Sequence, residues 1–327
     1  MDEHSVEVQE QYDVEKPRIW QVGLLYSLVV ILLVFVSTKL QEALQFNIGG
    51  LISEVFLIML PPLVFLFIFR FDTKKVLRWN RTSFVNFVLA FGIVIFGIPI
   101  VGVFNLLNIL IVKLLSGTVE TTQIPIGSGV GDLFIGVLVI AISAGICEEV
   151  LFRGVIQRSF ERFGSVKSIL ITAFLFGLTH FSFQSLFGTF LLGALIGFLV
   201  YKSDSLMIGM FAHFTNNAVA VVLNWVSIKM LEFLEKMGVE NVNNPAGQDV
   251  FSQFQGMSIP EIVFMAAVAL AVVSFSAAVF GVLVYWFIKL NSKNVEKPRE
   301  NQTRVSIIEF IPLIPGLLLV AYICINK

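Results

Sequence analysis

The sequence predicts an all-α fold, a polytopic bundle of transmembrane helices, on the strength of three observations. Of its 327 residues, 57% are hydrophobic and 33 are Phe. Only 14% are charged, about half the share that is usual in soluble domains. The apolar residues also come in blocks of about twenty, which is the length of a helix that crosses a hydrocarbon core about 30 Å thick. We therefore expect an integral, multi-pass membrane protein in contact with the lipid bilayer, in the plasma membrane if the organism is prokaryotic.

Apolar runs separated by polar breaks predict the individual helices in order along the chain. We expect nine spans, with eight as the alternative count. The nine lie near residues 19–38, 51–69, 83–112, 131–156, 167–183, 186–201, 205–228, 258–288 and 305–325.

Basic residues gather in alternate connections, and this asymmetry predicts the orientation of the bundle. The connections after the second, fourth and eighth spans are the basic ones, with Arg70, Lys74, Lys75, Arg78 and Arg81 in the first of them. Because short cytoplasmic loops are enriched in Lys and Arg, we expect these connections and the N-terminus to lie in the cytoplasm.

The chain divides by composition into five parts. They are an acidic cytoplasmic tail (1–18), N-terminal transmembrane helices (19–115), a four-helix core (131–228), an extracytoplasmic loop (229–257) and C-terminal transmembrane helices (258–327). The formal net charge is −1, which argues against a nucleic-acid partner. The sequence does not define an oligomeric state.

Two adjacent acids, Glu148 and Glu149, lie in the fourth predicted span. An ionisable residue within the membrane costs about 2.5–3.5 kcal/mol on insertion scales, so the pair needs a physical reason. Arg153 follows Glu149 by four residues and would lie on the same helix face. A Glu149–Arg153 pair would offset part of the cost and leave Glu148 with no partner nearby in the sequence.

Two of the three histidines also fall within predicted spans. His180 ends the segment that begins at Phe176, and His213 precedes Asn217 by one helical turn. A hairpin that turns at Gly164 would bring Glu148 and His180 to the same height, and His213 lies at a similar depth on a third helix. Each histidine alone is as well explained by hydrogen bonding between helices. Together the residues supply the groups needed to activate water and to hold an oxyanion.

Other polar residues in the spans are set aside at this stage. Glu54 and Glu309 are isolated acids near prolines, and we interpret them as features of helix breaks or interfaces. Cys147 is interpreted as a packing residue, because no cation or base that would activate a thiolate is evident nearby. We expect Cys147 and Cys324 to be reduced.

Three ordered motifs resemble the CPBP family of intramembrane proteases, also called the Abi or CAAX-protease family, which includes the Ras-converting endopeptidases. The motifs begin at Glu148, Phe176 and His213, and the resemblance covers about residues 131–228. It implies an intramembrane endopeptidase acting on a membrane-associated, prenylated or otherwise lipidated peptide or protein. The catalytic set that it implies is Glu148, Glu149, His180, His213 and Asn217, with Arg153 and Phe176 in support.

Two mechanisms stay open for such a site. In a metalloendopeptidase, Zn²⁺ would be bound by His180, His213 and Glu149; in a glutamate-type protease, Glu148 would activate water without a metal. Two competing functions are a non-catalytic bacteriocin-immunity or peptide-binding membrane protein, and a transporter, which also places Glu and His in mid-membrane. The sequence has no internal repeat, which disfavours the transporter.

Overall fold

The computed structural model describes residues 16–117, 119, 124–238, 251, 254, 256–292 and 305–326. Within these ranges every regular element is a helix, and no strand occurs, which confirms the all-α prediction. Among the described residues, seven helical segments are long and apolar enough to cross a membrane, so the chain is a multi-pass membrane protein. Residues 1–15 of the predicted acidic tail and most of the predicted outer loop lie outside the described residues.

The chain enters the bundle as a helical hairpin between Ile19 and Ile68. Its elements are α2 (Ile19–Leu32), the π-helical η1 (Leu33–Ser37), α3 (Thr38–Ile52), the π-helical η2 (Ser53–Met59) and α4 (Leu60–Ile68). Gln45 leaves the helical conformation, with φ 65° and ψ 159°. Ser37 Oγ then donates to Ser53 Oγ at 2.8 Å across the hairpin. The first two predicted spans are therefore the two antiparallel arms of this hairpin.

The central part of the chain forms the core of the bundle. After the short α5 (Thr73–Val76) and the long α6 (Phe84–Ser116), one continuous helical segment runs from residue 130 to residue 163, and three further helices follow. The elements of the continuous segment are α7 (Val130–Gly136), η3 (Val137–Ser143), α8 (Ala144–Glu149), η4 (Val150–Ile156), α9 (Gln157–Phe160) and η5 (Glu161–Phe163). The three helices are α10 (Ser165–Leu178), α11 (Phe183–Ser203) and α12 (Leu206–Lys236).

The helix predicted over 167–183 is shorter than expected, because α10 ends at Leu178. Thr179 Oγ1 donates to the carbonyl of Phe176 at 2.8 Å, which satisfies an acceptor at the helix end. Phe181 then adopts a left-handed conformation with φ 49°, and the next helix begins after Ser182. His180 consequently lies in the turn between α10 and α11, not within a helix as the sequence suggested.

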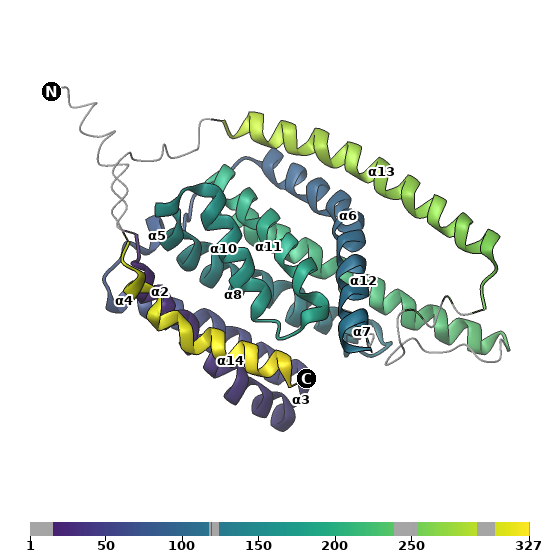
Figure 1. The fold of residues 1–327 in the computed structure, drawn as a ribbon, viewed down its shortest axis with the longest axis horizontal. Helices are drawn as coiled ribbons and strands as arrows, with labels where there is room; N and C mark the ends of the chain where they lie inside the picture. The colour runs from purple at the N-terminus through teal and green to yellow at the C-terminus, as the bar shows by residue number, and fades with distance from the viewer. Residues whose placement is uncertain are drawn as a thin grey trace.

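The C-terminal helices pack on opposite sides of this core (Figure 1). The helix α13 (Ile259–Leu290) lies along α6, and Asn86 and Asn291 donate to each other at 3.1 and 2.8 Å. The 3-10 helix η7 (Ile307–Leu313) and α14 (Ile314–Ile325) pack against α2. There, Ser27 Oγ donates to the carbonyl of Pro312 at 2.7 Å.

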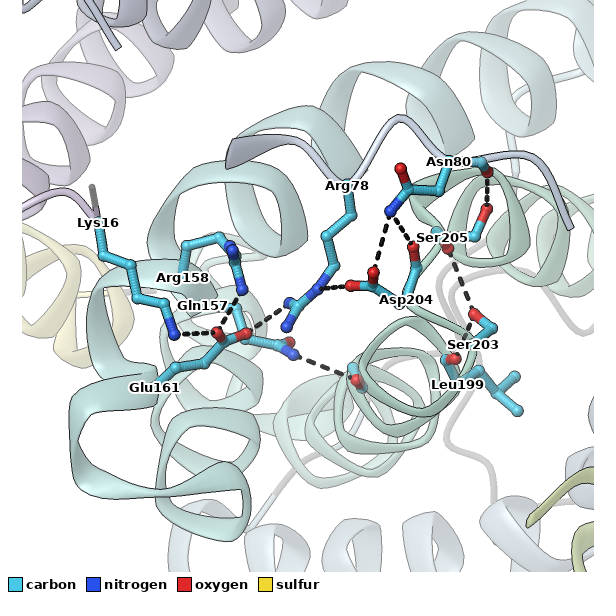
Figure 2. Close-up of polar contacts among 11 residues, drawn as sticks. Lys16, Arg78, Asn80, Gln157, Arg158, Glu161, Leu199, Ser203, Asp204 and Ser205 are labelled. Carbon is cyan, nitrogen blue, oxygen red and sulfur yellow. Dashed lines mark hydrogen bonds and ion pairs between the residues drawn. The ribbon is translucent and has the colours of Figure 1, made fainter. Parts of the chain in front are cut away.

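A polar cluster joins several connections at one end of the bundle (Figure 2). Arg78 contacts Glu161 at 2.5 Å and Asp204 at 2.7 Å, and so connects the segments that follow α4, α9 and α11. Lys16 reaches Glu161 at 3.2 Å, which places the N-terminal end of the described chain at the same end. These connections therefore share one side of the bundle. The nine-span count and the cytoplasmic identity of this side stay predictions.

Candidate active site

The two adjacent acids lie on a short α-helical stretch between two π-helical ones. Glu148 and Glu149 end α8, with η3 before it and η4 after it. Ser143 Oγ donates to the carbonyl of Val139 four residues earlier, a side-chain bond that competes with regular helical bonding. The π-helical turns change the direction in which successive side chains point, and such turns occur frequently at functional sites.

Glu149 points into the protein interior. Its Oε1 accepts from Arg153 Nη1 at 2.7 Å and lies 2.9 Å from His213 Nδ1. The carboxylate and the guanidinium are both fully buried, so the predicted Glu149–Arg153 pair exists. Arg153 Nη2 also donates to the carbonyl of Gly193 at 3.0 Å, which joins the pair to α11. Gly209 on α12 leaves room for Glu149, since a Cβ there would lie 2.9 Å from Glu149 Oε2.

Phe176 is the apolar centre around which these groups are arranged. Its ring meets His180 and His213 edge-on, with centroids 5.0 and 5.7 Å away. The Arg153 guanidinium lies 4.6 Å from the centroid of the same ring, an attractive cation–π distance. Phe152 packs against it from η4. Of the predicted supporting residues, Phe176 therefore contacts both histidines, and Arg153 is linked to His213 through Glu149.

A cavity of about 410 Å³ lies beside this cluster, between the N-terminal hairpin and the core. Of the five residues predicted to be catalytic, Glu148, His180 and Asn217 line it. Glu149 and His213 do not; they are buried behind Glu148. The predicted set is therefore divided into a layer that faces the cavity and a layer that supports it.

The two layers meet where His213 approaches Glu148. His213 Nε2 lies 3.8 Å from Glu148 Oε2, while Nδ1 of the same ring faces Glu149. A buried carboxylate at Nδ1 favours the proton on that nitrogen and leaves Nε2 directed at Glu148. His213 Nε2 thus faces Glu148 and not the cavity, so His213 is not oriented to donate to an oxyanion there.

His180 and Asn217 are held in place by backbone carbonyls. His180 Nδ1 lies 3.1 Å from the carbonyl of Phe176, so Nε2 is the nitrogen available to a ligand. Asn217 Nδ2 donates to the carbonyl of Ile140 at 2.9 Å, and Asn217 Oδ1 accepts from Asn216. A neutral amide of this kind retains one N–H for a ligand in the cavity.

Glu54 is a cavity residue that the sequence analysis set aside. It lies on η2 and lines the same cavity as Glu148. Among the described residues, its buried Oε2 has no hydrogen-bond partner. An acid inside an apolar span was the available signal, but nothing in the sequence indicates that the hairpin brings η2 against α8.

The predicted zinc ligands do not form a metal site as they are placed. In the part of the chain that the structure describes, no three His, Cys, Asp or Glu side chains form a group that could hold a metal ion. Glu149 Oε1 already accepts from Arg153 and His213, and His213 Nε2 faces Glu148. As they are placed, these donors do not converge on one point, and the zinc version stays a prediction.

Comparison with known proteins supports one family. Residues 130–219 match the family model described as type II CAAX prenyl endopeptidase, Rce1-like. No curated protein and no solved structure matches the chain. The matched residues include all five of the predicted catalytic positions and end two residues after Asn217. Over this region the chain is similar to the CPBP, or CAAX-protease, family of peptidases, which supports the resemblance seen in the sequence.

Proposed function

We propose that this protein is an intramembrane endopeptidase that hydrolyses a peptide bond in a membrane-associated, prenylated or otherwise lipidated substrate. The observation that carries the proposal is the shared cavity of Glu148, His180 and Asn217. An acid with no committed partner, an imidazole and an amide are the groups that hydrolysis by activated water requires. The family match at residues 130–219 supports the same chemistry.

Glu148 acts as the general base in this proposal. Its carboxylate takes a proton from a water molecule as the oxygen of that water forms a bond to the carbonyl carbon. The carbonyl π electrons move to the oxygen and give a tetrahedral oxyanion. When the C–N bond breaks, Glu148 returns the proton to the leaving amine, as a base that has gained a proton can.

Asn217 donates a hydrogen bond to the oxyanion, whereas His180, whose Nδ1 donates to a carbonyl oxygen, accepts a hydrogen bond from the attacking water at Nε2. Both side chains line the cavity and both are anchored to backbone carbonyls, so they need little reorganisation during the reaction. Removing one such donor costs about 10²–10³-fold in rate in well-studied hydrolases. His213 has a different role: held by Glu149, it positions the Glu148 carboxylate.

The test compares Glu148→Gln with a matched control in purified full-length protein. Gln keeps the size of the side chain but cannot accept the proton, so cleavage of a peptide library should fall by about 10²–10⁴-fold. Glu309→Gln is the control, because Glu309 also has a buried oxygen without a described partner but does not line the cavity. The control should cleave like the wild type.

Activity of Glu148→Gln within threefold of wild type would exclude Glu148 as the base. If the wild type binds peptides from the library but cleaves none, the protein is a peptide-binding or immunity factor and not a peptidase.

A further inference from the structure

The cavity is acidic in a way that the proposed reaction does not explain. Glu54 and Glu148 both line it, and each has a buried Oε2 without a hydrogen-bond partner among the described residues. Among these same residues, no Lys or Arg lines the cavity. General-base catalysis needs one of these carboxylates, so the second acid needs another explanation.

The position of Glu54 is fixed by the packing of the hairpin on the core. η2, which carries Glu54, packs against α8, which carries Glu148. At this contact Cys147 Sγ lies 3.9 Å from Met59 Sδ. Cys147 directly precedes Glu148 on α8, and Met59 lies on η2 together with Glu54. Two separate helices therefore direct their acids to one space.

The polar side chains that line the cavity near Glu54 direct their hydrogen bonds elsewhere. Ser53 Oγ donates to the carbonyl of Gly49 at 2.8 Å, and Ser37 Oγ donates to Ser53. Gln41 Nε2 donates to Ser37 Oγ at 3.1 Å. In these hydrogen bonds none of the three side chains donates to Glu54, and Glu54 Oε2 has no partner among the described residues.

A buried carboxylate is costly unless it is paired. In a cavity of this size, the natural partner is part of a ligand. A ligand carboxylate would be repelled by Glu54 and Glu148, whereas an ammonium or guanidinium would form a charge-assisted hydrogen bond with either.

We propose that Glu54 forms a substrate-binding subsite for a cationic group, an ammonium or a guanidinium, next to the peptide bond that Glu148 attacks. The inference rests on the proposed peptidase function and adds a specificity to it. A Lys or Arg side chain and a free amino terminus are the two sources of such a group in a peptide.

The experiment measures the charge preference of cleavage. Internally quenched peptides carry Lys, norleucine or Glu at each position flanking the bond, and each peptide is made with a free and with an acetylated amino terminus. The wild type should cleave the best Lys peptide at least about 10-fold faster, in kcat/KM, than its norleucine counterpart. The Glu peptide should be the poorest. A preference that follows the free amino terminus would identify that source instead.

Variants assign the preference to Glu54. In Glu54→Gln the ratio of Lys to norleucine should approach one, while Glu54→Asp, which keeps the charge, should retain a preference. Glu309→Gln should keep the wild-type ratio, because Glu309 does not line the cavity. The proposal is overturned if the wild type shows no charge preference at any position or terminus, or if Glu54→Gln keeps it. It is also overturned if Glu54→Gln slows all peptides equally and shifts the pH profile, since Glu54 would then act on Glu148.

A binding measurement separates this inference from the proposed function. In the Glu148→Gln background, a fluorescent Lys peptide should bind more tightly than its norleucine counterpart, and adding Glu54→Gln should abolish the difference. A Glu54-dependent preference in binding, with no cleavage by the wild type, would refute the peptidase and leave the subsite standing. Cleavage without any such preference would refute the subsite alone.

Discussion

Glu149 and Arg153 are buried together, and each depends on the other. Glu149 Oε1 accepts hydrogen bonds from both Arg153 and His213, so a change here disturbs three side chains at once. Breaking a buried pair by removing one partner typically costs about 3–5 kcal/mol, because the other charge is left without compensation. The residue thus connects the stability of the core to the orientation of His213.

We expect Glu149→Gln to lower both stability and activity. The neutral amide leaves the Arg153 charge uncompensated in the interior, and thermal unfolding in detergent should occur at a clearly lower temperature than in the wild type. The double variant Glu149→Gln/Arg153→Met removes both charges and should recover much of the lost stability without recovering activity. A Glu149→Gln protein as stable as wild type but inactive would instead assign Glu149 a direct catalytic role.

The zinc version of the site has its own measurement. If His180 and His213 bind Zn²⁺, a strong chelator should abolish cleavage, added Zn²⁺ should restore it, and His→Ala at either position should lower the bound metal in elemental analysis. The orientation of His213 between Glu149 and Glu148 favours the other result. We expect chelator-resistant activity in a metal-poor preparation, with His180→Ala still impaired. Chelator-sensitive activity with one zinc per chain would contradict this.

At the residue scale, the sequence could predict what depends on local spacing. The Glu149–Arg153 pair follows from a separation of four residues on a helix. The division between cavity-facing Glu148 and buried Glu149 follows from their adjacency. Glu54 could not be assigned, because its place opposite Glu148 arises from packing between segments almost a hundred residues apart.

At the scale of elements, π-helical turns gather around the cavity. Ser37 lies on η1, Glu54 on η2, Ile140 on η3 and Phe152 on η4, and all four residues line the cavity. A π-helical turn widens the helix and shifts the register of the side chains that follow it. Hydrophobic periodicity in the sequence could predict the spans but not these changes of register, since uniformly apolar segments carry no periodic signal.

Gly145 sets the distance between the helix of the acids and the helix of His213. A Cβ at Gly145 would lie 3.1 Å from the Phe214 backbone nitrogen and 3.2 Å from the Met210 carbonyl oxygen, both on α12. Backbone atoms cannot move aside as a side-chain end can. α8 and α12 would have to separate by a few tenths of an ångström.

We therefore expect Gly145→Ala to reduce kcat by about 10-fold, since displacements approaching 1 Å can cost about 10²-fold in rate. Gly281→Ala is the matched control, because a Cβ at that glycine of α13 has open space around it. It should cleave like the wild type. Peptidase assays on the two variants, with unfolding temperatures measured in parallel, test the prediction. Equal activity in both would show that the spacing of α8 and α12 does not control the site.

At the scale of the whole molecule, the two ends of the bundle differ in character. One end is closed by the ion pairs of Arg78, Glu161 and Asp204, together with Lys16 (Figure 2). The other end contains the hairpin turn at Gln45 and the turn that carries His180, and the cavity extends between them. Ion pairs thus hold one end of the bundle together, and the cavity that the candidate catalytic residues line lies toward the other end. We call the end with the ion pairs the tied end.

The tied end strengthens the prediction of topology. Basic residues alone give a statistical orientation for each loop separately. In the structure, the Arg78 contacts require the connections after α4, α9 and α11 to lie on one side, and the Asn86–Asn291 pair places the end of α13 next to the start of α6. A single orientation must therefore account for all of these segments, including the N-terminal Lys16.

Single-cysteine labelling in whole cells tests this orientation, in a background where Cys147 and Cys324 are replaced. Lys74→Cys and Ser292→Cys lie in exposed positions at the tied end, and Met237→Cys lies exposed near the far end of α12. A membrane-impermeant thiol reagent should label only Met237→Cys in intact cells and all three after lysis, because the positive charge of the tied end keeps it in the cytoplasm. Labelling of Lys74→Cys and Ser292→Cys in intact cells, without labelling of Met237→Cys, would show that the orientation of the bundle is the reverse of the predicted one. The predicted number of spans would be unaffected. Labelling of Ser292→Cys but not Lys74→Cys would contradict the Asn86–Asn291 contact, because it would require an odd number of spans between these two positions.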